Sequence, residues 1–160
     1  MTVPMATGPS VTHVQITTEE RAANKLSKRN LEKAVVALSE YGVVILDGAV
    51  SDDSLDFLNP RMVEEAKALR EGSGTWFNYD SKAQNILQHM IPDPEYLLLD
   101  VHANLFAMDV CKTMIGPNPV LRYHKANTKF PGKSRQPVHS DVHYAHPRAC
   151  FSLAVNIVLI

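Results

Sequence analysis

Hydrophobic residues recur at three- and four-residue steps early in the chain, which is the spacing of one buried helix face. This spacing runs through residues 31–41, and Gly42 follows it in the position of a glycine that ends a helix. Upstream, Thr17–Glu20 has the Thr-x-x-Glu form of a capping box and predicts a helix start. The β-branched run at residues 43–46 then predicts a short buried strand.

The middle of the chain shows two further helix starts and a polar stretch. Ser51 precedes two aspartates and has the form of an N-cap, since acidic side chains in a first turn complement the helix dipole. Asn59–Pro60 predicts a second start, because proline is well tolerated at the first helical position. Residues 71–88 are polar and contain glycine, and we interpret them as a long surface loop.

Helical spacing returns after Asp93–Glu95, where an aspartate, a proline and a glutamate repeat the order of a helix start. The spacing continues over residues 97–115, about five turns, and ends at Gly116. Hydrophobic and polar residues then alternate over residues 120–124, which indicates a strand. The apolar residues 151–160 predict a final strand.

Helices precede strands along the chain, an order that favours an α+β protein with a sheet sandwich or barrel. The chain of 160 residues is about the size of one domain, and 45% hydrophobic residues suffice for a core. We interpret residues 1–13 as a flexible N-terminus and residues 14–160 as a single domain. Because a final strand without a polar tail exposes an edge, we expect this domain to be incomplete at its C-terminal end.

Charge and cysteine content argue against several classes of function. Sixteen basic and seventeen acidic residues give a net charge of −1, so binding to nucleic acid or to an anionic membrane has no electrostatic support. Cys111 and Cys150 fit no metal-ligand spacing and indicate a reducing compartment. No apolar run approaches the ~20 residues of a membrane span, and the N-terminus lacks the layout of a signal peptide. We therefore expect a soluble cytoplasmic protein.

The candidate chemistry lies in the pattern His139-Ser140-Asp141. On an extended strand, side chains two residues apart fall on the same face, so the imidazole and the carboxylate point the same way. They form two thirds of a 2-His-1-carboxylate triad, which holds non-haem Fe(II) and leaves positions open for a co-substrate and O₂. The His-x-Asp pattern alone recurs by chance, so its interpretation as a metal site depends on its setting, the sequence around it.

That setting is a family resemblance that covers the chain from about residue 31 onward. The matching pieces, in order, are Tyr41–Gly48, Gln84–Ile86, Asp93–Pro117, Gln136–Asp141 and Leu153–Asn156. Together they resemble the N-terminal half to two thirds of a phytanoyl-CoA dioxygenase-family enzyme, closest to the fungal branch that serves secondary metabolism.

The resemblance implies N-terminal helices packed on a double-stranded β-helix (jelly-roll), with Fe(II) as cofactor and 2-oxoglutarate and O₂ as co-substrates. Oxidative decarboxylation of 2-oxoglutarate to succinate then drives oxidation of a C–H bond in a small, apolar substrate that resembles a natural product. By position, His139 and Asp141 match the first two iron ligands. Gln136 and Gln84 match residues that contact 2-oxoglutarate.

The sequence departs from the family after Asp141. The family's second histidine ligand and its 2-oxoglutarate-binding arginine lie further along, whereas His143, His146 and Arg148 come too early to match them. We therefore expect a truncated chain with an incomplete jelly-roll and little activity alone. Its candidate substrate-pocket residues are Trp76, Tyr79, His143 and Asn156.

Two alternatives stay open. The first is a non-catalytic, dioxygenase-like partner subunit, which forms homo- or hetero-oligomers by pairing another strand with residues 155–160. The second is a zinc site, built from His139, His143 and His146 on a folded-back loop.

Overall fold

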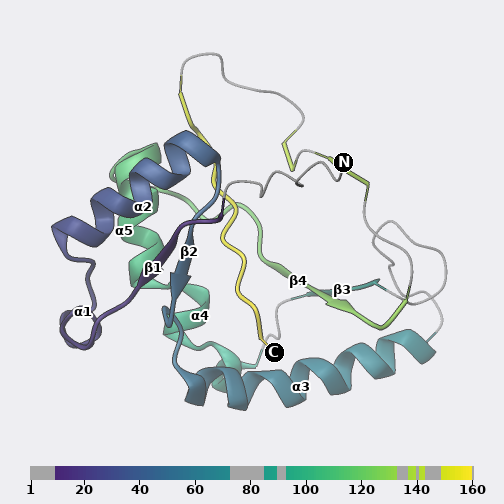
Figure 1. Ribbon diagram of the computed structural model, residues 1–160. Coiled ribbons are helices and arrows are strands. Elements are labelled where there is room, and N and C mark those ends of the chain that lie inside the picture. The colour runs from purple at the N-terminus through teal and green to yellow at the C-terminus, as the bar shows by residue number, and fades with distance from the viewer. Residues whose placement is uncertain are drawn as a thin grey trace, which may run out of the picture. The chain divides into compact units, whose positions relative to one another are not determined.

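The computed structural model describes residues 10–72, 85–89, 93–132, 137–139, 141–142 and 149–159. These residues combine helices with two small sheets, so the mixed helix and strand class is confirmed (Figure 1). A jelly-roll is not seen among them. The chain divides into two compact units. The first comprises Met1–Ala49, Ala103–Pro119 and Phe151–Leu153, and the second comprises Val50–His102, Val120–Cys150 and Ala154–Ile160.

The first unit packs helices on one face of a two-stranded parallel sheet. Its elements are β1 (His13–Gln15), α1 (Thr18–Ala23), α2 (Lys28–Tyr41), β2 (Ile45–Asp47) and α5 (Leu105–Ile115). Successive side chains of β1 alternate between faces, so Val14 is fully buried while its two neighbours are exposed. The buried core comprises Val14, Ile16, Leu26, Ala34, Phe106 and Val110.

The predicted capping box is confirmed at the start of α1, and its glutamate also joins α1 to α2. The Glu20 carboxylate accepts hydrogen bonds from the backbone N–H groups of Thr17 (2.9 Å) and Ser27 (2.7 Å) and from the Asn30 side-chain amide (2.8 Å). Burial works to raise the pKa of Glu20, but these hydrogen bonds outweigh it and lower the pKa to about 2. Asn24, at φ 49°, then ends α1 in the left-handed conformation.

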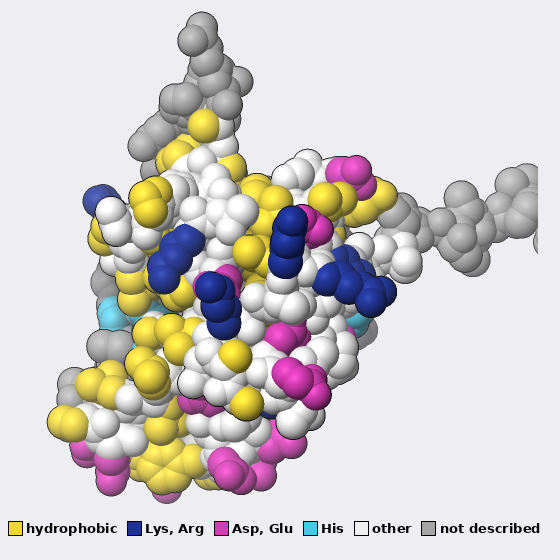
Figure 2. Space-filling view, turned by 90° about the vertical axis from the view of Figure 1, so that its left-hand side faces the viewer, with side chains coloured by type: hydrophobic (Ala, Val, Ile, Leu, Met, Phe, Trp, Pro, Cys, Tyr) yellow, Lys and Arg dark blue, Asp and Glu magenta, His cyan; other side chains and the backbone are white. Residues whose placement is uncertain are grey.

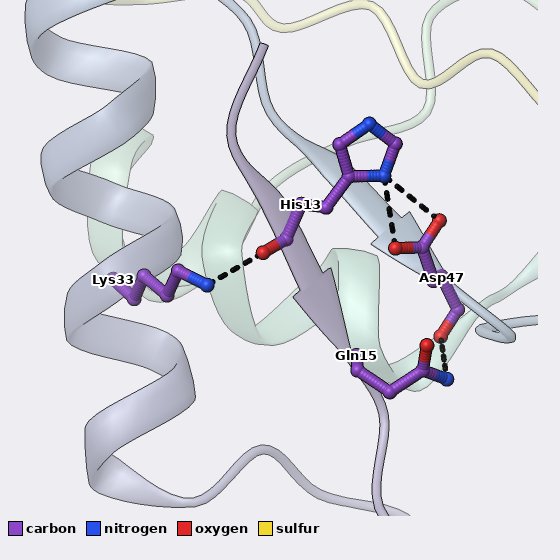
Figure 3. Close-up of polar contacts among 4 residues, drawn as sticks. All are labelled: His13, Gln15, Lys33 and Asp47. Carbon is purple, nitrogen blue, oxygen red and sulfur yellow. Dashed lines mark hydrogen bonds and ion pairs between the residues drawn. The ribbon is translucent and has the colours of Figure 1, made fainter. Parts of the chain in front are cut away.

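A short polar network links β1 to β2 and to α2 (Figure 3). His13 Nδ1 lies 2.9 Å from Asp47 Oδ2, which links β1 to β2. Lys33 of α2 donates to the His13 carbonyl at 2.6 Å, and Gln15 donates to the Asp47 carbonyl at 3.4 Å. β1 begins at His13, the last residue of the segment that the sequence pattern assigned to a flexible terminus.

The second unit is built around one long helix. Its elements are α3 (Asp52–Glu71), β3 (Asn85–His89), the 3₁₀ turn η1 (Pro94–Tyr96), α4 (Leu99–His102) and β4 (Lys125–Lys129). The predicted N-cap is confirmed, because the Ser51 hydroxyl accepts from the Ser54 N–H. The predicted second start at Asn59–Pro60 is wrong, since α3 runs through Pro60. Leu58 and Met62 are buried on either side of this proline, and their burial favours one continuous helix.

The antiparallel pair β3–β4 packs against α3 through a buried glutamine. Gln88 donates to the Met62 carbonyl at 2.8 Å and to Glu65 Oε2 at 3.0 Å, and it accepts from the Thr128 hydroxyl. Gln88 is fully buried, and these partners satisfy its side-chain amide. The loop predicted for residues 71–88 is therefore wrong at its end, where β3 begins at Asn85.

Other sequence-based predictions also differ from the structure. The single helix predicted over residues 97–115 is divided, because the Asn104 side chain accepts from the Ala107 N–H and starts α5 as a new helix. Residues 120–124 form no strand, since β4 begins at Lys125, opposite the last residue of β3.

The described part of the C-terminal segment, residues 151–159, contains no strand, so the predicted final strand is wrong there. Val155 and Val158 are 54% and 73% exposed. Oligomer formation through this segment stays a prediction.

The described surface carries mixed charge. Figure 2 shows Lys and Arg side chains on the same face as Asp and Glu side chains, with hydrophobic side chains between them. In the described residues, we find no helix with the length and hydrophobicity needed to cross a lipid bilayer.

Candidate metal site

His139 and Asp141 lie together in the second unit. His139 Nε2 is 3.3 Å from Asp141 Oδ1, and the two side chains are 31% and 76% exposed. The predicted strand is wrong at residues 137–139 and 141–142, which instead contain bends. A bent backbone thus brings the two groups together, although strand alternation was the reason to expect them side by side.

A backbone carbonyl orients the His139 ring. His139 Nδ1 lies 2.8 Å from the Pro137 carbonyl oxygen, which only accepts hydrogen bonds, so Nδ1 carries the proton. In the neutral ring, the lone pair is then on Nε2, the atom that faces Asp141. Metal-binding histidines are commonly fixed in this way, with one ring nitrogen bonded to a carbonyl and the other on the metal.

The distance between the two groups fits a shared metal ion. Two ligands about 2.1 Å from one ion and at right angles around it lie about 3.0 Å apart. The observed 3.3 Å is close to that separation. Both side chains reach solvent, so the pair is accessible to an ion.

Most of the other predicted site residues fall outside the described residues. They are Gln84 and Gln136 for 2-oxoglutarate and Trp76, Tyr79 and His143 for the substrate pocket. Asn156 is described, and the interpretation of it as an amide within an apolar strand is wrong. It is exposed and lies in the segment without a strand, and its place in a substrate pocket stays a prediction.

A third metal ligand does not emerge from the part of the chain that the structure describes. Within those residues, no group of three or more His, Cys, Asp or Glu side chains is placed to hold a metal ion. His143 and His146, which the zinc alternative requires, are outside them.

Two histidine contacts were missed by the sequence reasoning. His13 meets Asp47 across the parallel sheet, and the ring centroids of His102 and His124 lie 4.8 Å apart. The partners are 34 and 22 residues apart in the chain, so no short motif marks either pair.

Comparison with known proteins places the chain in a family. Residues 38–160 match the family described as phytanoyl-CoA dioxygenase (PhyH), and the chain belongs to that family. Among curated proteins, it is similar to dioxygenase af480 of Aspergillus fumigatus, with 27% identity over 163 residues. That alignment covers 97% of this chain and 50% of the relative, so the chain spans about half the length of the relative.

Proposed function

We propose that this chain carries two of the iron ligands of an Fe(II)- and 2-oxoglutarate-dependent dioxygenase, and that the ligands are His139 and Asp141. The observation that carries this proposal is the 3.3 Å approach of His139 Nε2 to Asp141 Oδ1, with the opposite ring nitrogen held by Pro137. Family membership over residues 38–160 supports it, and so does the similarity to a protein named as a dioxygenase.

The proposed reaction is oxidation of a C–H bond in a small, apolar molecule that resembles a natural product. When bound, iron supplies the oxidising chemistry together with 2-oxoglutarate and O₂. The residues of this chain would hold the iron and orient the side chains that bind it. The Pro137 carbonyl keeps the proton on Nδ1 of His139, and the Asp141 carboxylate supplies negative charge beside Nε2. The jelly-roll expected from the family, with Gln84 and Gln136 on the co-substrate, is part of this proposal.

The 160-residue chain is expected to convert 2-oxoglutarate to succinate slowly or not at all in the presence of Fe(II). The described residues supply two ligands to this site, and two protein ligands hold a divalent ion weakly and do not fix the remaining coordination positions. Succinate formation under air, with and without Fe(II), measures this directly.

The His139→Ala variant provides the control for that assay. If turnover is fast and His139→Ala abolishes it, the proposal that His139 binds iron stands. The expectation that no residue after Asp141 completes the iron site would then be wrong. Fast turnover that survives His139→Ala would contradict the proposal as a whole.

A further inference from the structure

His102 and His124 bring two segments of the second unit together. His102 is the last residue of α4, and the chain leaves this unit directly after it. The chain returns at Val120, and His124 immediately precedes β4. The two rings meet edge to face, with centroids 4.8 Å apart and an interplanar angle of 68°. Their contact therefore joins the segment that leaves the unit to the segment that returns.

Hydrophobic packing contributes little to holding the returning segment. Val120, Leu121 and Tyr123 are 75%, 69% and 67% exposed, and residues 120–124 have no regular secondary structure. His124, in the same segment, is partly buried, and its Nδ1 atom is buried. The ring contact with His102 is thus a link between this segment and α4.

The surroundings of His124 disfavour a positive charge. Its buried Nδ1 has no hydrogen-bond partner, so a proton there would be an N–H without an acceptor. Burial lowers the pKa of His124 below the ordinary value of 6.5, and the neighbouring His102 lowers it further. His102 Nδ1 lies 2.9 Å from the Leu98 carbonyl, so it donates there and leaves the lone pair of the neutral ring on Nε2.

The carboxylates on α4 and α3 accept hydrogen bonds from other partners, and β3 and β4 contribute basic groups. β4 contributes the basic Lys125, whose ammonium lies 5.1 Å from the centre of the Tyr123 ring, and β3 places His89 opposite Lys125. On α4, the Asp100 carboxylate accepts from the Ser51 N–H and from the hydroxyls of Ser51 and Ser54. On α3, Glu65 accepts from Gln88.

We propose that the contact of His124 with His102 is acid-sensitive: it holds residues 120–124 on α4 while the His124 ring is neutral and releases them when that ring takes up a proton. The direction of the pH dependence follows from the lowered pKa of His124. The released segment binds protons more readily than the docked one, so docking is complete above about pH 6.5 and weakens as the pH falls through the lower, docked value.

The test is a pH titration of the whole chain by NMR, which follows the histidine ring signals and the amide exchange of residues 120–124. We expect the midpoint of His124 below 6.5 and a severalfold rise in exchange as His124 is protonated, after correction for the intrinsic effect of pH. A midpoint at or above 6.5, or exchange that does not follow the protonation of His124, would overturn the proposal.

Two variants separate the contact from general acid effects. His124→Phe keeps an aromatic ring but does not titrate, and we expect exchange in residues 120–124 to become insensitive to pH. His102→Phe is expected to raise the His124 midpoint, because the repelling partner is gone. Unchanged pH dependence in the first variant, or an unchanged midpoint in the second, would also overturn the proposal. If either variant fails to fold, the wild-type titration decides alone.

Discussion

Replacing Glu20 by alanine is expected to lower the free energy of unfolding by about 3 kcal/mol at neutral pH. Glu20 is 4% exposed, and its carboxylate joins the start of α1 to the start of α2 through backbone N–H groups and Asn30. Alanine removes the carboxylate and leaves the two backbone N–H groups and the Asn30 amide without this acceptor. Urea unfolding followed by circular dichroism measures the loss.

The pH dependence gives a second, independent result for the same residue. The pKa of Glu20 falls from 4.5 to about 2 in the folded chain, so its contribution is complete above about pH 4.5 and is lost as the pH falls toward 2. The Glu20→Ala variant is expected to lack that part of the acid-induced loss of stability. Glu32→Gln is the control, because Glu32 is an exposed carboxylate of α2 whose pair with Lys28 is long, at 3.8 Å. Equal effects of the two substitutions would contradict the role given to Glu20.

Replacing Phe106 by alanine is expected to cost about 3–5 kcal/mol of unfolding free energy, the range for a large aromatic side chain removed from a packed core. Phe106 is 6% exposed on α5 and packs in the core that includes Val14 of β1. The cavity left behind weakens the packing of α5 in the first unit. Urea unfolding measures this change as well.

Phe57→Ala is the matched control for that substitution. Phe57 lies on α3 in the second unit, is 47% exposed and stacks on Tyr96 with a centroid distance of 5.1 Å. We expect it to cost about 1 kcal/mol, because a half-exposed ring in one stacking contact loses much less than a buried one. A Phe106→Ala variant no less stable than Phe57→Ala would contradict the described core.

Local signals predicted the ends of several elements. The capping box at Thr17, the N-cap at Ser51 and the stop at Gly42 are confirmed, because each depends on hydrogen bonds within a few residues of one helix end. Pro60 led to a wrong prediction of a helix start, because that prediction also depended on a local preference. Its backbone preference is local, whereas the burial of Leu58 and Met62 that favours the continuous α3 is not.

Pairing between distant segments was beyond these signals. β1 is three residues long and pairs with β2, while β3 pairs with β4 across about forty residues of chain (for example Ile86 opposite Thr128). Strands this short carry too few side chains for a period of two to stand out. The sequence therefore predicted strands at residues 120–124 and 151–160, where alternation or hydrophobicity was stronger but the described residues provide no partner strand.

The candidate site was predictable in part. The sequence predicted that His139 and Asp141 lie side by side, but it did so from strand alternation, whereas a bent backbone brings them together. The Pro137 carbonyl that orients the ring depends on a bend, which side-chain pattern does not reveal. The contact of His102 with His124 forms only when α4 and the start of β4 meet in the folded unit.

We propose that His139 and Asp141 bind one metal ion, and titration with Mn²⁺ tests this at the level of single residues. Mn²⁺ is paramagnetic and takes the same nitrogen and oxygen ligands as Fe(II), so it broadens the NMR signals of a ring that it binds. The internal control is His13, whose ring also faces a carboxylate but does so through Nδ1, at 2.9 Å from Asp47. We expect the His139 ring signals to broaden at Mn²⁺ concentrations that leave those of His13 sharp, and we expect Asp141→Asn to remove the difference. Equal broadening of the two histidines, or broadening of His139 that Asp141→Asn leaves unchanged, would contradict it.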